Sequence, residues 1–283
     1  MGIQTPPNKP AIDVPAIHLT GLDAYAPAEI ARRVEIAGRT KAALPLEQLA
    51  TLGLMAGVFI SFGAALYTMV MTGGTLGFGP NRLVGGLSFS LGLILIIIGG
   101  AELFTGNTLI VMAWADAKVS TRALARNWGV SFVANVAGAV LLALLVHWSG
   151  VLEIGGSRET AVKIAEAKAA LSFKQAFFRG VLCNLLVCLA VWLSFACHTV
   201  TDKILAIVLP IAAFVTLGFE HSIANCYLLP VAMFSGADIG LGAFLANLVP
   251  VTLGNILGGA GGVAGVYWLI YLRGVRDPHT AHK

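Results

Sequence analysis

The sequence predicts an all-α membrane protein, with six transmembrane helices arranged as two inverted three-helix repeats. Composition gives the first indication: the 283 residues are 57% hydrophobic and 11% charged, whereas a soluble chain carries about 25% charged residues. Six apolar stretches are also long enough, or nearly so, for the roughly 20 residues that a crossing helix needs. Finally, one polar pattern occurs in both halves of the chain, which indicates an internal repeat.

The repeated pattern is Gly-x-Glu-x-x-x-x-Asn, at residues 100–107 and again at 218–225. Each copy lies inside an apolar stretch. Two further correspondences flank the copies in the same order: Asn-x7-Asn-x2-Gly at 127–138 and 247–258, and the segment 57–61 with the segment 180–184. Because each repeat holds an odd number of spans, the two repeats are expected to have opposite orientations in the membrane.

The elements follow in order. Residues 1–45 are expected to form a cytoplasmic tail and an amphipathic interfacial helix, since Ile30, Val34 and Ala37 share one face of the segment 27–41. A solvated charged helix is the alternative. The remaining units and spans are these: first repeat 46–149, with spans 46–70, 82–114 and 130–148; extracytoplasmic linker 150–171, with a helix at 159–170; second repeat 172–272, with spans 173–195, 204–234 and 243–271; cytoplasmic tail 273–283.

The two polar stretches predict that spans 2 and 5 are broken helices. An ionisable group inside a span costs roughly 2.5–3.5 kcal/mol on insertion scales. A broken helix in lipid is tolerated only beside protein or a water-filled cavity. The helix starts at the two breaks would direct positive dipole ends toward one point, which attracts a small anion. The polar residues of the two breaks are Glu102, Asn107, Glu220 and Asn225. For Glu220 and Asn225, capping of the broken helix is the alternative role.

His221 is the most informative of the intramembrane residues, because it has no capping duty and can exchange a proton near physiological pH. We expect it to face a path through the protein. Apolar residues near the two breaks are candidates for narrow gates along that path, although ordinary packing or lipid contact is the commoner role for each one taken alone. They are Phe89, Leu93, Leu103, Phe104 and Phe214.

Charge and motifs narrow the class further. With both termini in the cytoplasm, 12 of the 18 basic residues lie in inner segments, as the positive-inside rule favours. We therefore expect a multi-pass protein of the inner membrane. The sequence has no phosphate-binding loop, no paired Asn-Pro-Ala motif and no metal-ligand cluster. No cofactor, nucleic-acid partner or enzymatic activity is expected, and the alternatives kept open are an aquaporin-like channel for neutral solutes and, least favoured, a membrane-embedded enzyme.

Several stretches together resemble the formate/nitrite transporter family over residues 27–272. They are 27–41, 56–60, 100–107, 184–192, 218–225 and 251–255. The resemblance implies an aquaporin-like six-helix fold in membrane lipid and a homopentamer with a pore in each protomer. It also implies proton-coupled passage of small monovalent anions. Formate is the first choice, and nitrite or hydrosulfide is the alternative.

The resemblance also implies roles for individual residues. His221 resembles the central pore histidine, with Glu220 beside it, and Thr105 resembles the loop threonine that faces it. Lys168 and Asn184 stand where the family has a basic residue and an amide. The implied constrictions are Phe89, Leu93 and Phe214 on one side and Leu103 on the other. The histidine is expected to hydrogen-bond or protonate the anion, which then crosses the apolar gates as a neutral acid.

Overall fold

The computed structural model describes residues 23–274, and the regular secondary structure in this range is entirely helical. The expected all-α class is therefore confirmed, whereas the predicted tails fall mostly outside the described residues. The helices are α1 Pro27–Ala42, α2 Leu46–Met71, α3 Phe78–Gly99, α4 Phe104–Asn107, α5 Val111–Ala115, α6 Thr121–Trp148, α7 Ser157–Ala169, α8 Phe173–Ala196, α9 Val200–Thr216, α10 Ser222–Phe234, α11 Leu241–Ile256 and α12 Val266–Tyr271. Short 3-10 turns cover Thr108–Ile110 and Val151–Glu153.

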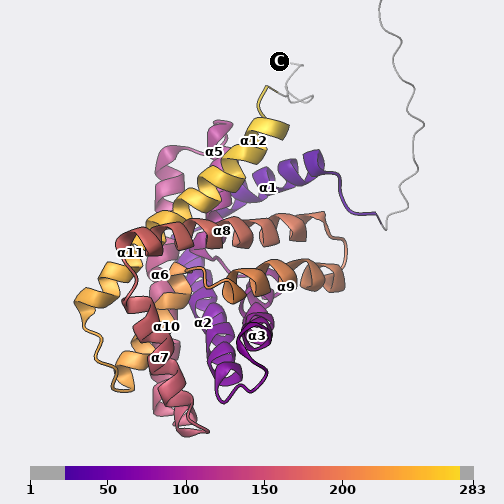
Figure 1. Ribbon diagram of the computed structural model, residues 1–283. Helices are drawn as coiled ribbons and strands as arrows, with labels where there is room; N and C mark the ends of the chain where they lie inside the picture. The colour runs from indigo at the N-terminus through magenta and orange to yellow at the C-terminus, as the bar shows by residue number, and fades with distance from the viewer. Residues whose placement is uncertain (1–22, 275–283) are drawn as a thin grey trace, which may run out of the picture.

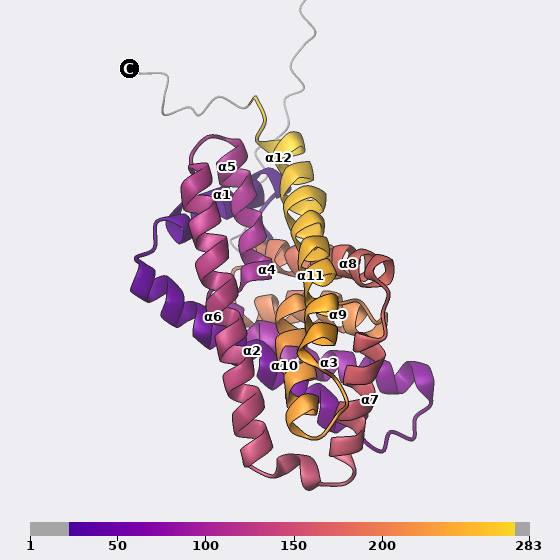
Figure 2. The ribbon, with the colours of Figure 1, turned by 90° about the vertical axis from the view of Figure 1, so that its left-hand side faces the viewer.

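Two groups of long helices build the body. In one, α2 packs against α6 and α3; in the other, α8 packs against α11 and α9, and α3 joins the groups by packing against α9. Figure 1 shows α8 and α9 side by side. Figure 2 shows α1, α5 and α12 at one end of the molecule and α7 at the opposite end. The two polar stretches, residues 100–107 and 218–225, lie between these ends.

Glycines let the paired helices approach closely. A Cβ atom on Gly57 of α2 would overlap the carbonyl oxygen of Asn135 on α6, and one on Gly254 of α11 would overlap the carbonyl oxygen of Phe177 on α8. These helix pairs therefore meet backbone to backbone, as small residues permit in membrane proteins.

In the part of the chain described, five helices are long and apolar enough to cross a membrane. They are Leu46–Met71, Phe78–Gly99, Thr121–Trp148, Phe173–Ala196 and the continuous helix Leu241–Tyr271. The predicted span 204–234 instead comprises α9 and α10. The predicted helix at 159–170 corresponds to α7, and that at 27–41 corresponds to α1.

Each polar stretch begins with a non-helical segment, residues 100–103 and 218–221, and each segment starts with a glycine of positive φ. Between α3 and α4, Gly100 has φ 79°; between α9 and α10, Gly218 has φ 74°. Residues with a Cβ rarely adopt this conformation, so glycine allows the chain to leave the helix at these points. A third irregularity lies in the predicted span 243–271, where the glycine-rich segment Leu257–Gly265 is π-helical. Such π segments are frequent at functional sites.

Candidate functional site

Two cavities lie along α3. The larger, of about 560 Å³, includes Lys168 and is here named the Lys168 cavity; the smaller, of about 330 Å³, is named the Lys41 cavity. They have no lining residue in common. Phe89 lines the first and Leu93 the second, yet these residues are one helical turn apart, about 6 Å along the axis. A thin wall therefore separates the cavities.

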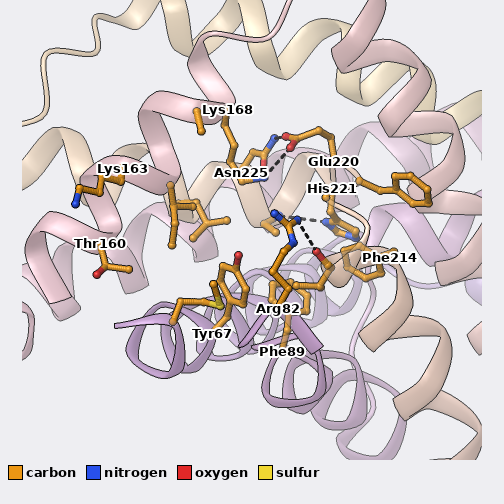
Figure 3. A pocket seen from close by; sticks show the side chains of 18 of the residues that line it. Tyr67, Arg82, Phe89, Thr160, Lys163, Lys168, Phe214, Glu220, His221 and Asn225 are labelled. Atoms are coloured by element: carbon orange, nitrogen blue, oxygen red, sulfur yellow. Dashed lines mark hydrogen bonds and ion pairs between the residues drawn. The ribbon is translucent and has the colours of Figure 1, made fainter. Parts of the chain in front are cut away.

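His221 lies at this wall, immediately before α10, and its side chain is buried and lines the Lys168 cavity (Figure 3). Its Nδ1 accepts a hydrogen bond from the backbone N–H of Ala224 at 3.2 Å. In the neutral ring the proton must then be on Nε2. That nitrogen lies 2.9 Å from Oγ1 of Thr105, to which it donates. His221 therefore caps the start of α10 with its side chain, so the expectation that it has no capping duty was wrong. The same bond sets the tautomer that points at Thr105.

Glu220 has different hydrogen-bond partners from the adjacent His221. Its Oε1 accepts from Nζ of Lys168 at 2.9 Å, and its Oε2 accepts from Nδ2 of Asn225 at 2.7 Å. Asn225 also donates to Oδ1 of Asn247, and Nδ2 of Asn247 donates to the carbonyl oxygen of Lys168. Glu220 is only 3% exposed, and a buried carboxylate needs this degree of compensation. The predicted residues Lys168, Glu220 and Asn225 therefore form one network.

The other half of the chain contains the same network. Lys41 donates to Glu102 at 2.6 Å, Asn107 donates to Glu102 at 2.9 Å, and Asn107 donates to Asn127 at 2.9 Å. Asn127 closes the ring by donating to the carbonyl oxygen of Lys41. Lys41 was not among the predicted site residues. The sequence did place Lys41 at the end of the amphipathic segment 27–41, a few residues before the first apolar span, and that position could have marked it as a candidate.

Two asparagines bind the backbone of the non-helical stretches. Asn135 accepts from the N–H of Phe104 and donates to the carbonyl oxygens of Gly53 and Glu102. Such bonds satisfy backbone groups that lipid could not. The equivalent bonds of the second half join Asn255 to Ser222, Gly180 and Glu220.

This correspondence corrects one detail of the sequence comparison. Asn135 donates to the carbonyl oxygen of Gly53, and its equivalent Asn255 donates to that of Gly180. Gly53 is therefore equivalent to Gly180, and Gly57 is equivalent to Asn184. The sequence alignment of segment 57–61 with segment 180–184 was displaced by one helical turn. Glycine at both positions of the first half, Gly53 and Gly57, made the two registers indistinguishable from sequence.

Asn184 donates to the backbone of Thr105, and the hydrogen bonds of His221 do not include Asn184. Its Nδ2 lies 3.2 Å from the carbonyl oxygen of Thr105 and 2.6 Å from that of Asn255. Thr108 donates to the same Thr105 carbonyl at 2.6 Å, and the Cys188 thiol lies beside both. Thr108 and Cys188 were not predicted, because they become neighbours only through folding.

The predicted gate residues separate into three groups. Phe89 and Phe214 pack edge to face at the Lys168 cavity, with ring centroids 5.6 Å apart. Leu93 lines the Lys41 cavity together with Leu103, and so does not join Phe89 and Phe214 there. Phe104 lines neither cavity; its ring packs against Trp128 and Phe132, in the core.

Further positive charge lies around the Lys168 cavity, where Arg82, Lys163 and Arg179 join Lys168. Arg82 and Arg179 donate to backbone carbonyl oxygens of residues 215–218. As single basic residues near span ends they carried no sequence signal. Within residues 23–274, no group of three or more His, Cys, Asp or Glu side chains could hold a metal ion.

Two cavities on opposite sides of a thin apolar wall, with buried ion pairs beside them, characterise a membrane channel or transporter. The chain belongs to the formate/nitrite transporter family, whose model matches residues 28–269. Formate channel FocA of Escherichia coli strain K12 is 39% identical over 273 residues, covering 89% of this chain and 96% of the relative. A probable formate transporter of Methanothermobacter thermautotrophicus is 40% identical over 267 residues, covering 87% and 97%.

The fold agrees with that membership. A solved structure described as a pentameric formate channel with formate bound matches with a TM-score of 0.75 at 40% identity, covering 81% of this chain and 98% of that one. The sequence resemblance to the family is thus confirmed. The chain is a multi-pass membrane protein whose relatives are channels and transporters.

Proposed function

We propose that the protein conducts small monovalent anions across the membrane, formate foremost, and is not an enzyme. The relatives described as formate channels support this assignment. The observation that carries it is the hydrogen bond between Thr105 and His221, 2.9 Å long, at the wall between the two cavities. It is a polar pair in an otherwise apolar barrier, where a passing anion would have to be met.

The path begins and ends at a lysine. Lys168 lines one cavity and Lys41 the other, and each keeps a buried glutamate partner. Each ammonium retains N–H donors for an arriving carboxylate. Between them the anion must pass Phe89 and Phe214 and then Leu93. An unpaired ion in such surroundings costs several kcal/mol, so we infer that it crosses as the neutral acid.

The geometry favours hydrogen bonding by His221 over direct proton donation. A histidine donates a proton only from its doubly protonated form. Here Nδ1 already accepts from the N–H of Ala224, so a second proton would require that bond to break. We infer that neutral His221 and the Thr105 hydroxyl orient the substrate while water supplies the proton. A pH-dependent break of the Ala224 bond is the alternative.

We further propose the finer architecture that the repeat implies. The helices α3 with α4–α5, and α9 with α10, would each form one broken span, giving six spans in two inverted halves. The Lys41 cavity would face the cytoplasm with both termini, and the Lys168 cavity would face outward. The matching networks of Glu102 and Glu220 support this arrangement. We expect the inner membrane, a homopentamer, and proton-coupled flux with nitrite and hydrosulfide as lesser substrates.

Formate flux into proteoliposomes tests the function. The purified protein should pass labelled formate faster as the external pH falls, and His221→Phe should abolish most of the flux. His221→Gln separates the two roles of histidine, because glutamine offers an N–H donor but does not titrate. Retention of flux and pH profile in His221→Gln favours hydrogen bonding; a flattened profile favours protonation. Formate flux that is equal in empty liposomes would refute the proposal, and competition by nitrite and hydrosulfide ranks the substrates.

A further inference from the structure

The Lys168 cavity has more room and more positive charge than formate requires. At about 560 Å³ it falls within the range of pockets for drug-sized ligands, whereas formate has three heavy atoms. Its lining includes exposed residues, Lys163 and Gly74, so the cavity opens to solvent. The excess volume faces apolar groups, among them Tyr67, Met71 and Phe89.

The positive charge is not neutralised by acidic side chains. Among the six salt bridges formed within residues 23–274, none includes Arg82, Lys163 or Arg179. Glu220 is the only acidic residue in the lining, and Lys168 and Asn225 already bind it. The cavity therefore carries a surplus of positive charge beside an apolar wall.

The arginines keep free donors. An arginine has five N–H donors; two of those on Arg82 bind the carbonyl oxygens of Thr216 and Val215, which leaves three. Figure 3 shows the Arg82 side chain extending from α3 toward the 215–221 segment. Arg179 makes one long bond, 3.5 Å, to the carbonyl oxygen of Gly218. A guanidinium with free donors binds a carboxylate in two-pronged fashion.

From these observations we infer that the Lys168 cavity binds an aromatic monocarboxylate that is too large to pass. Its carboxylate binds Arg82 and Arg179, and its ring packs against Tyr67 and Met71. The ring stops at Phe89 and Phe214, whose centroids are 5.6 Å apart. Such a ligand blocks formate from one side. The inference rests on the proposed function, because it takes this cavity as one entrance of the pathway.

Benzoate is the probe, and calorimetric titration into the purified full-length protein is the first measurement. We expect benzoate to bind and benzamide, which has the same shape without the charge, to bind at least about tenfold more weakly. Arg179→Gln should weaken benzoate by about ten- to 100-fold. Lys203→Gln removes one positive charge at the Lys41 cavity and is the matched control, with benzoate affinity unchanged. Equal binding of benzamide, or equal loss in both variants, would overturn the inference.

Formate flux provides the second measurement and does not depend on the stability of any variant. In proteoliposomes, benzoate outside should inhibit formate uptake by wild-type protein, and added formate should relieve the inhibition. Uptake of labelled benzoate through the protein would contradict the block. Formate flux without any effect of benzoate refutes this inference and leaves the proposed function intact. Benzoate binding without formate flux refutes the proposed function instead.

Discussion

The half built around Glu102 and the half built around Glu220 hold their charges in the same way, yet they differ at the next residue. Both glutamates bind one lysine and one asparagine. Lys41 also donates to Asn107 at 3.3 Å, a bond that Lys168 does not make to Asn225. Leu103 follows the first and His221 follows the second. The repeated network is thus a scaffold that holds a non-helical stretch, and the position after the glutamate is where the chemistry differs.

The largest expected effect comes from breaking the scaffold itself. Glu220→Ala removes the buried partner of the mostly buried Lys168 ammonium, and removing one member of a buried ion pair costs about 3–5 kcal/mol. Glu102→Ala is the matched variant and should cost less. The reason is exposure: the side chains of Lys168 and Glu220 are 16% and 4% exposed, against 33% and 9% for Lys41 and Glu102.

Unfolding in detergent, followed by circular dichroism for both variants and wild type, measures this difference. The control is Glu29→Ala, which removes an exposed ion pair with Arg33 on α1 and should change stability by less than about 1 kcal/mol. If Glu102→Ala proves as costly as Glu220→Ala, the two networks are energetically equivalent despite their different exposure.

The second effect concerns the position at which the halves differ. His221→Leu gives the second half the residue of the first, so that Thr105 loses its partner and the N–H of Ala224 loses its acceptor. Loss of a hydrogen bond that orients the substrate should lower formate flux by about ten- to 100-fold. Flux per folded protein, measured in proteoliposomes, tests this. Leu103→His is the converse variant, and restored flux in the double variant would show that the two positions are interchangeable.

The sequence was enough to predict the glutamates and asparagines of the scaffold, but not Lys41 or the bonds to Asn127 and Asn247 on other helices. A glycine, a glutamate and an asparagine at fixed spacing predicted both helix breaks, because an acid in an apolar run has few explanations. Pairing of Thr105 with His221 followed from the family resemblance. Most helix bounds were close because hydropathy sets them, but the predicted span 130–148 began nine residues late, since α6 starts at Thr121 and its first turns carry Arg122, Arg126 and Asn127.

What could not be predicted depends on contacts between distant segments. Phe104 and Leu93 are apolar residues in apolar surroundings, and only the packing decides whether they line a cavity or the core. Arg82 and Arg179 are isolated in sequence, yet both reach the segment 215–218. The register between Gly57 and Asn184 was missed because Gly53 and Gly57 are both glycine, and only the bonds of Asn135 and Asn255 across the fold distinguish the two alignments.

That register gives the third prediction. By the correspondence of Asn135 with Asn255, Gly259 is equivalent to Ala139, and Gly57 is equivalent to Asn184. At this contact the first half therefore has its glycine, Gly57, on α2, whereas the second half has its glycine, Gly259, on the segment that follows α11. A Cβ on Gly259 would overlap Thr108 and Asn184. Gly259→Ala should cost about 1–3 kcal/mol by overpacking and displace the support of Thr105.

Thermal unfolding and formate flux distinguish these two consequences. The double variant Gly259→Ala with Asn184→Gly copies the first half at both positions, so it should recover stability while flux stays low. Recovery of flux as well would mean that Asn184 does not position Thr105. Gly261→Ala, in the same π-helical segment but facing only Leu257 of that segment, is the matched control.

The smallest expected effect comes from breaking the ion pair between Glu35 and Lys118, which has no counterpart in the second half within residues 23–274. Glu35 lies six residues before Lys41, and the equivalent residue before Lys168 is Val162. Glu35 accepts from Lys118 at 2.8 Å, and Lys118 also pairs with Asp116. Burial raises the pKa of Glu35 above its ordinary value, more than the bond from Lys118 lowers it. Burial would lower the pKa of Lys118, but its bonds to Glu35 and Asp116 raise it.

Lys118→Met should therefore destabilise the protein by about 1 kcal/mol, in a pH-dependent way. A carboxyl whose folded pKa is raised contributes stability below its unfolded pKa and loses it as the pH rises through the folded pKa. Without Lys118 the pKa of Glu35 rises further. The variant should thus match wild type most closely in acid and fall behind as the pH rises to neutral. Melting temperatures across that range test this, and a deficit that is the same at every pH would show that Lys118 contributes packing and not charge.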